Sequence, residues 1–246
     1  MITFFRKIRQ RLVSENRFSK YLIYAVGEII LVMIGILLAF QVNNWKEKRT
    51  RISKESSYLR DIKTNLQNDI EAIDSVLAFN AYKAVITDSM FYTLEQHSDP
   101  EVYMPIIIPY MYTLTEYAVF EPNRSTFSNM LSSENIDLIT DEELKKQLSQ
   151  YYKTDFNSTS EESAKQKARE FGSYVGTVAF NRQTVKALVN HDSSLKDISE
   201  VNMHKDPKVY ALLFNMLMST QSQSIILAEA KQNISQLITD ISAEIE

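Results

Sequence analysis

The chain has 246 residues, no cysteine and a formal net charge of −4 at pH 7. The absence of cysteine excludes disulfide bonds and thiolate metal sites. Only four glycines and five prolines are present, and this composition favours helices over sheets with tight hairpins. Residues 1–54 carry 11 basic and three acidic side chains. The rest of the chain is therefore acidic and is not expected to bind nucleic acid.

Residues 1–18 are predicted to form a basic amphipathic helix that lies in the membrane interface. Ile2, Phe5, Ile8 and Leu12 fall on one helical face, and basic side chains lie mostly elsewhere. A disordered basic leader is the alternative, because a short helix of this kind is marginal without lipid. The basic side chains expected to contact anionic lipid headgroups are Arg6, Lys7, Arg9, Arg11, Arg17 and Lys20.

Residues 19–45 are predicted to form a transmembrane helix. Its apolar part has Glu28 as its only charged side chain. This part contains about 22 residues and reaches about 33 Å, enough to cross a bilayer core. Tyr24 and Trp45 lie near its ends, where aromatic rings prefer the headgroup zone. A buried core helix and a cleavable signal peptide are the alternatives, but the basic flanks and the lack of an A-x-A-like site favour an uncleaved anchor.

The orientation of this helix is a near tie by charge. Six basic residues, with Lys20 as the last, precede its apolar part, and five follow the helix. A short basic N-terminus that precedes the first span usually stays inside the cell. The N-terminus is therefore expected in the cytoplasm, and residues 46–246 are expected on the other side of the membrane.

A carboxyl group in a lipid-facing helix costs about 3 kcal/mol on insertion scales, so Glu28 is expected to be sheltered, protonated or paired. Glu28 belongs to a stripe with alternating spacings of three and four residues, which includes the small pair Gly35 and Ala39. Two interpretations stay open: Glu28 is an ion or proton site within an assembly, or it pairs with Lys20, Arg17 or a neighbouring helix. Both predict a homo-oligomer or a complex with another membrane protein. The spacing pattern runs over Ala25, Glu28, Val32, Gly35, Ala39 and Val42, and the first five of these form the predicted contact stripe.

Residues 46–246 are predicted to form a soluble domain, an all-α helical bundle. No Gly or Pro occurs between Trp45 and Pro100, and apolar residues recur every seven positions. This pattern predicts one long amphipathic helix that can be continuous with the span. The stretch HSDPEVYMPIIIPYMYTLTEY contains three prolines and is predicted to be a loop with short helical pieces. The residues that recur every seven positions are Ile52, Leu59, Leu66 and Ile73.

The sequence marks two further helix starts. Thr140 and Glu143, three residues apart, are predicted to form a capping box. Asp206 is predicted to cap a last helix that Pro207 opens. The apolar stripe of that last helix, which Thr220 and Gln223 interrupt, consists of Val209, Leu213, Met216, Leu227, Ala230, Ile234, Leu237 and Ile241.

The chain resembles an uncharacterised family of single-span membrane proteins common in Bacteroidota, in the stretches SENRFSKYLIYAVGEIILVMIGILLAFQVNNWKEK and STFSNMLSSENIDLITDEELKKQLSQYY. The resemblance implies a bacterial inner-membrane protein and supplies no catalytic residues. With the orientation expected from the charges, the body would lie in the periplasm. Members of that family tend to have Ser-Gly where this chain has Ser133 and Glu134. Asn135 is expected to adopt the left-handed conformation that the glycine would supply.

The sequence carries no recognisable enzyme chemistry. His97, His191 and His204 are far apart and are expected at the surface, and no phosphate-binding, dinucleotide-binding, zinc-protease or nucleophile-elbow motif occurs. We expect no enzyme activity, no cofactor and no metal. The sequence predicts a membrane-anchored helical scaffold or interaction subunit that oligomerises through its transmembrane stripe. Two alternatives stay open: an ion-coupled or force-transmitting subunit of a membrane complex that uses Glu28, and a ligand-sensing helical bundle.

Overall fold

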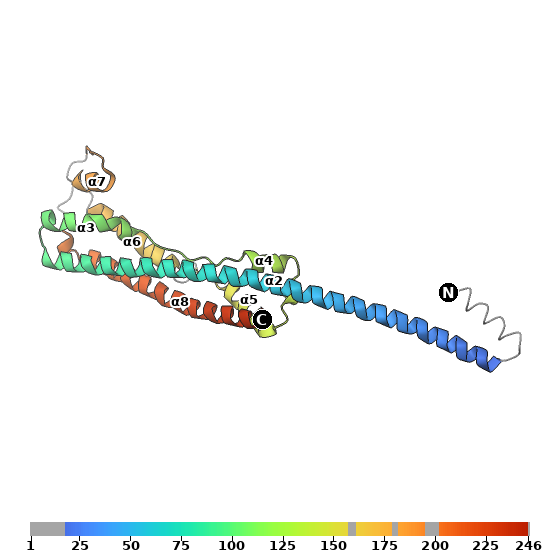
Figure 1. Cartoon of the computed structure of the whole chain (residues 1–246). Coiled ribbons are helices and arrows are strands. Elements are labelled where there is room, and N and C mark those ends of the chain that lie inside the picture. Colours follow the sequence, from blue (N-terminus) through green and yellow to red (C-terminus); the bar gives the residue numbers. More distant parts are fainter. Residues whose placement is uncertain (1–17, 157–160, 179–181, 195–201, 246) are drawn as a thin grey trace. The chain divides into compact units, whose positions relative to one another are not determined.

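The computed structural model describes residues 18–156, 161–178, 182–194 and 202–245 (Figure 1). All regular secondary structure in these residues is helical, which confirms the predicted all-α fold. The predicted interfacial helix lies outside the described residues, except for Phe18 at its end. The helices, labelled as in Figure 1, are α2 (Phe18–Gln96), α3 (Pro100–Thr115), α4 (Ser125–Ser132), the 3₁₀ turn η1 (Ile136–Leu138), α5 (Glu142–Lys153), α6 (Glu162–Val178), α7 (Arg182–Val189), the 3₁₀ turn η3 (Met203–Lys205) and α8 (Pro207–Ile245).

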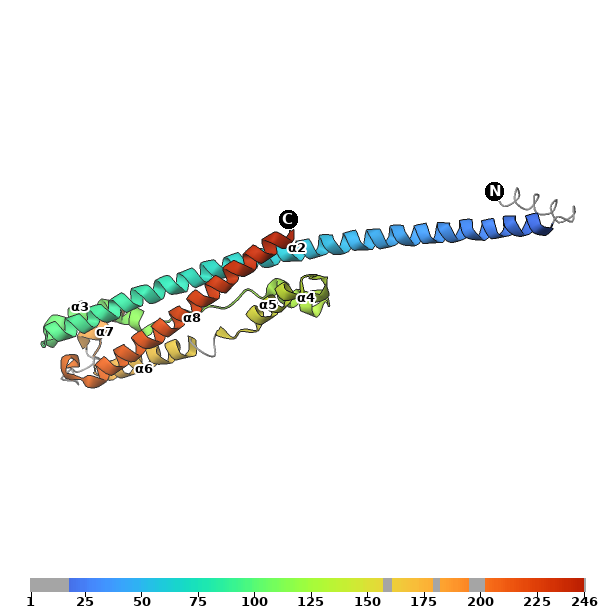
Figure 2. The same cartoon turned by 90° about the horizontal axis from the view of Figure 1, so that it is seen from below.

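The chain divides into two compact units, Met1–Ser56 and Ser57–Glu246, and each is described by itself. Helix α2 supplies the described residues of the first unit and the first helix of the second. Within the second unit, α2 and α8 lie side by side in both views (Figures 1 and 2). Lys231 Nζ on α8 lies 2.5 Å from Asp74 Oδ1 on α2, whereas Met203, before α8, packs with residues near the end of α2. The two helices are therefore antiparallel.

Helix α2 runs without interruption from Phe18 to Gln96, so the predicted long helix is continuous with the apolar segment. Along its seven-residue stripe, Leu59, Leu66 and Ile73 are buried in the second unit, but Ile52 in the first unit is 54% exposed. The periodic pattern therefore extends beyond the part of the helix that the bundle covers.

The core of the second unit consists of two apolar clusters with polar side chains between them. The polar side chains are Asn80, Lys83 and Thr87 on α2, and Thr220 and Gln223 on α8, and all five are buried. A buried polar group is costly unless it is hydrogen-bonded, so these residues need partners inside the bundle. The α5 cluster includes Leu59, Leu66, Ile73, Phe127, Leu148, Tyr151, Leu227 and Ile234. The α3 cluster includes Ile86, Met90, Leu94, Tyr103, Ile107, Phe171, Leu213 and Met216.

The predicted proline-rich loop is wrong, because Pro100–Thr115 forms the single helix α3. Pro100 stands in its first turn, where a missing N–H costs little, and the Asp99 carboxylate accepts a hydrogen bond from the N–H of Glu101 (2.9 Å). Pro105 and Pro109 lie inside the helix but on its exposed side. The opposite face is buried in the α3 cluster, and we attribute the persistence of the helix to this packing.

The start of α5 also corrects the sequence prediction, while the start of α8 confirms it. The cap of α5 is Asp141, whose Oδ1 accepts from the N–H groups of Glu143 (2.8 Å) and Leu144 (3.0 Å). The predicted box with Thr140 is therefore displaced by one residue. At α8, Asp206 Oδ1 accepts from the N–H of Lys208 (2.9 Å), and all eight predicted stripe residues are buried.

The end of α4 has the left-handed residue one position earlier than predicted. Glu134 has a φ of 55°, whereas Asn135 has a φ of −90°. The N–H of Asn135 donates to the carbonyl oxygen of Met130 (2.8 Å), and the N–H of Glu134 donates to that of Leu131 (3.3 Å). This is the bonding of a Schellman motif, in which glycine is the usual left-handed residue. The chain therefore keeps the turn without the glycine.

Candidate functional site

The first unit exposes a long apolar stretch of α2. This helix is long and apolar enough to cross a membrane, and no residue of its most apolar part is buried. Leu31, for example, is 72% exposed. Apolar surface in water costs about 25 cal/mol per Å². The stretch is therefore compatible with a membrane anchor.

The predicted contact stripe lies within this stretch. Glu28, Val32, Gly35 and Ala39 are exposed, and Ala25 is half-buried. A Cβ atom placed on Gly35 would meet no described atom within 4 Å, so a second helix can approach the backbone closely there. All five residues belong to one helix, whose geometry brings them to one face. The contact itself stays a prediction.

The predicted basic lipid contacts cannot be placed in the same way. Five of them lie before α2, outside the described residues, and Lys20 lies in α2 but its side chain is not among those described. The five are Arg6, Lys7, Arg9, Arg11 and Arg17.

A hydrogen-bonded polar layer lies inside the second unit, at the level where the apolar stripe of α8 is interrupted. Asn80 Nδ2 on α2 donates to Gln223 Oε1 (3.0 Å) and Ser224 Oγ (3.1 Å) on α8. Gln223 Nε2 donates to the carbonyl oxygen of Ala118 (2.9 Å), in the connection between α3 and α4. Gln223 therefore joins three segments, which explains why a polar residue occupies a core position.

Lys83 lies one helical turn further along α2 and is only 3% exposed. Its Nζ donates to the backbone carbonyl oxygen of Glu116. Burial lowers the pKa of the Lys83 ammonium to about 8, an effect that the nearby Glu116 carboxylate partly offsets. Lys83 is therefore a buried base whose charge changes close to physiological pH.

A second buried network surrounds Asp69, which is 2% exposed. Its Oδ1 accepts from the N–H of Asn123 (2.8 Å), and its Oδ2 accepts from Tyr151 Oη (2.7 Å). Burial raises the pKa of Asp69, and the bonds from Asn123 and Tyr151 oppose that rise. Asn65 Nδ2 donates to Thr126 Oγ1 (2.9 Å) in α4. These bonds fix the connection before α4 against α2 and α5.

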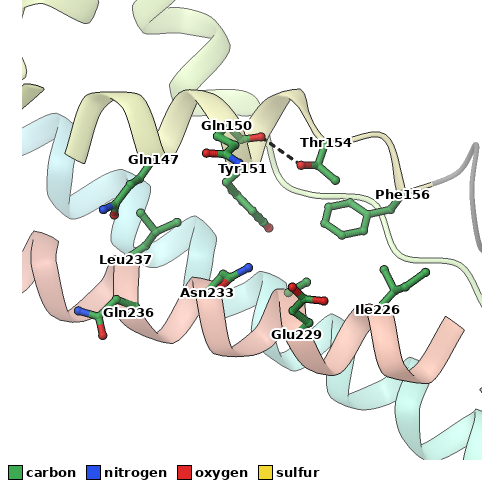
Figure 3. Close-up of a pocket in the computed structure, with 11 residues that line it drawn as sticks. Gln147, Gln150, Tyr151, Thr154, Phe156, Ile226, Glu229, Asn233, Gln236 and Leu237 are labelled. Atoms are coloured by element: carbon green, nitrogen blue, oxygen red, sulfur yellow. Dashed lines mark hydrogen bonds between the residues drawn. The ribbon is translucent and has the colours of Figure 1, made fainter. Parts of the chain in front are cut away.

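A cleft of about 490 Å³ separates α5 from α8 (Figure 3). Glu229 and Asn233 on α8 face Gln150 and Tyr151 on α5 across it. Two carbonyl oxygens near the end of α5 are already used, because Arg124 donates to that of Tyr152 (3.1 Å) and to that of Thr154, just after the helix (3.0 Å). The side chains that line the cleft supply further acceptor oxygens, among them those of Gln150, Glu229 and Asn233.

Residues 28–205, more than half of the chain, match a family described as "Family of unknown function (DUF6090)". The chain belongs to this family. No curated protein and no solved structure matches the chain. The DUF6090 match begins at Glu28 and includes Asp69 and Lys83, but it ends before α8 and Gln223. It agrees with the resemblance to an uncharacterised family.

Sequence reasoning missed Asp69, Asn80 and Lys83. The signal was present, because all three continue the core spacing of α2 between Leu66 and Met90 in steps of three or four residues. A polar residue at a core position of a helix in this DUF6090 chain therefore indicates a buried network and not an exposed face.

No metal site is found in the part of the chain that the structure describes, where no group of three or more His, Asp or Glu side chains could hold an ion. His191 is exposed and His97 is half-buried. His204 Nδ1 donates to the carbonyl oxygen of Leu94, so this histidine ties the start of α8 to the end of α2.

Proposed function

We propose that the chain is a membrane-anchored helical scaffold that holds its bundle at a bacterial inner membrane and binds other protein chains there. The observation that carries the proposal is the exposed apolar stretch of α2 in the first unit. Lipid would cover these side chains, whereas the second unit buries two apolar clusters of its own. An anchor and a folded body are the two parts that a scaffold of this kind requires.

The scaffold self-associates through the Glu28 stripe. Association between membrane helices depends on close backbone approach, which small residues such as Gly35 and Ala39 allow. Contact with a second helix would also remove the Glu28 carboxyl group from lipid, where it is costly. The open space at Gly35 supports this contact.

Single-cysteine cross-linking in native membranes tests the association, and the chain suits this method because it contains no cysteine. Val32→Cys is expected to give a disulfide-linked dimer on oxidation, because position 32 lies in the middle of the stripe and the variant keeps Gly35 and Ala39. Ile34→Cys is the matched control, since two residues along a helix turn the side chain by about 200° to the other side. Monomer from Val32→Cys, or equal dimer from both variants, would contradict the proposal.

The N-terminus lies in the cytoplasm and the second unit in the periplasm. The support is the short basic segment before the span, which favours the cytoplasmic side. Ala243→Cys, at an exposed position of α8, is expected to react with a membrane-impermeant maleimide in intact spheroplasts. Labelling only after lysis would reverse the orientation without affecting the anchor.

An ion-coupled or force-transmitting subunit is the rival function, favoured by the position of Glu28 on an open face of the apolar stretch. The two functions differ in what Glu28 must do. A purely structural carboxyl group predicts that Glu28→Leu changes the dimer yield of Val32→Cys. Ion coupling predicts that Glu28→Gln leaves this yield unchanged but that the variant gene fails to complement a deletion of the wild-type gene in cells.

A further inference from the structure

We propose that the cleft between α5 and α8 is a binding site for an aliphatic amine, of the linear di- or polyamine class. The cleft lies wholly within the second unit. Its volume of about 490 Å³ falls in the range of small-molecule sites. This site goes beyond the scaffold function, which requires no small ligand.

The charge of the cleft selects a cation. Glu229 is the only charged side chain among the described residues that line it. In the part of the chain that the structure describes, Glu229 forms no ion pair, whereas Lys231 on the same helix pairs with Asp74 (2.5 Å). None of the described residues that line the cleft is Lys or Arg, so an anion would find no countercharge among them.

The amide groups of the cleft select a ligand that donates hydrogen bonds. Gln147 Nε2 donates to Glu143 Oε1 (3.3 Å), and Gln236 Nε2 donates to Asp240 Oδ1 (2.7 Å). These carboxylates only accept, so they fix the orientation of both amides. The Oε1 atoms of Gln147 and Gln236 therefore remain as acceptors, which an ammonium group with three N–H donors can use.

The apolar side chains of the cleft suit a hydrocarbon chain. Tyr151 is largely buried, and its hydroxyl group is committed to Asp69, so only its ring remains for a ligand. Phe156 and Leu237 are also buried and add apolar surface. Glu229 and Gln236 are seven residues apart on α8, about 10 Å along the helix axis. A linear amine of this length would extend from the Glu229 carboxylate along the cleft toward the Gln147 amide, which points toward α8 (Figure 3).

Isothermal titration calorimetry on the full chain in detergent tests the site, with 1,4-diaminobutane and spermidine as probes. Saturable binding of one molecule per chain is expected, and 1,4-butanediol, which lacks the charge, is expected not to bind. Glu229→Gln is expected to weaken the amine affinity by about tenfold or more, because it removes a charge-assisted hydrogen bond. Glu244→Gln, an exposed position near the end of α8, removes the same charge outside the cleft and is expected to change the affinity less than about twofold.

A second variant supplies the cation from the chain itself. Asn233→Lys places an ammonium group four residues after Glu229, the favourable order for an ion pair on a helix. It is expected to abolish amine binding while the helical circular dichroism of the chain is unchanged. Absence of saturable binding to wild type, or equal weakening by Glu229→Gln and Glu244→Gln, would overturn the proposal.

Discussion

Helix α2 contributes to both units of the chain, and the two units differ in whether the apolar side chains of this helix are exposed or buried. In the first unit its apolar side chains are exposed, and Leu31 is 72% exposed. In the second unit the same helix buries Leu59 and Leu66, and even the polar Asn80 and Lys83. The helical backbone is equally regular in both, so the helix itself does not decide where its side chains go. The second unit therefore carries its own core, whereas none of the described residues covers the apolar stretch of the first unit.

The largest expected effect follows from placing charge in the first unit. Leu31→Arg combined with Leu38→Arg is expected to prevent membrane retention, because each charge costs about 3 kcal/mol at the centre of a span. The measurement is the fraction of full-length protein that stays with membranes after alkaline carbonate extraction. Ile52→Arg, also in the first unit but beyond the apolar stretch, is the control and is expected to remain in the membrane fraction. Retention of the double variant would show that the stretch is not the anchor.

The second prediction compares two members of the same seven-residue stripe. Leu66→Ala is expected to lower the free energy of unfolding by about 2–5 kcal/mol, because it opens a cavity in the α5 cluster. Ile52→Ala is expected to change it by less than about 0.5 kcal/mol, because Ile52 is 54% exposed. Chemical denaturation of the full chain in detergent, followed by circular dichroism, measures both. Equal losses would contradict the difference in burial between Leu66 and Ile52.

The seven-residue stripe of α2 also shows which features can be predicted from the sequence and which cannot. Periodicity predicts the long α2 and the all-α bundle, and the pair Asp206 and Pro207 predicts the start of α8, because all of these depend on local patterns. It does not distinguish Ile52 from Leu66, because the difference lies in which other helices cover them. The loop predicted from Pro105 and Pro109 is wrong for the same reason, because the packing of α3 outweighs the local cost of two prolines inside a helix. The cleft between α5 and α8 is lined by residues as far apart in the sequence as Gln147 and Gln236, and no local sequence pattern predicts that they lie near each other.

A third prediction uses the buried charge of Lys83. Its pKa is about 8 in the folded chain against the ordinary 10.5, so the unfolded chain holds the proton over a higher pH range. The folded state is therefore penalised fully below about pH 8, and its stability is expected to rise between about pH 8 and 10.5, by on the order of 3 kcal/mol. Lys83→Met is expected to abolish this rise, whereas Lys153→Met, at an exposed position, is expected to retain it. The free energy of unfolding measured across this pH range checks both.

A smaller effect is expected at the polar layer. Gln223→Ala removes one of the two acceptors of Asn80 Nδ2 and the donor for the Ala118 carbonyl oxygen. A buried group left without its partner costs about 1–3 kcal/mol, so the free energy of unfolding is expected to fall by this amount. Gln221→Ala, two residues earlier and exposed, is expected to have almost no effect. If the two variants are equally stable, the polar layer does not hold α8 against α2.

The smallest expected effect is a gain in the free energy of unfolding, at residues with a positive φ. In the described residues a positive φ occurs only in the second unit, at Glu134 and Asn190. Glu134 is held there by the Schellman bonds and by Asn135, whose Nδ2 donates to Tyr58 Oη on α2 (3.1 Å). Glu134→Gly is expected to raise the free energy of unfolding by about 1 kcal/mol, because glycine adopts the left-handed conformation without steric cost. Asn190→Gly is expected to gain less, because asparagine tolerates that conformation better than glutamate does. Thermal unfolding of both variants decides the point: a loss at Glu134→Gly would mean that the carboxylate contributes more than its backbone costs.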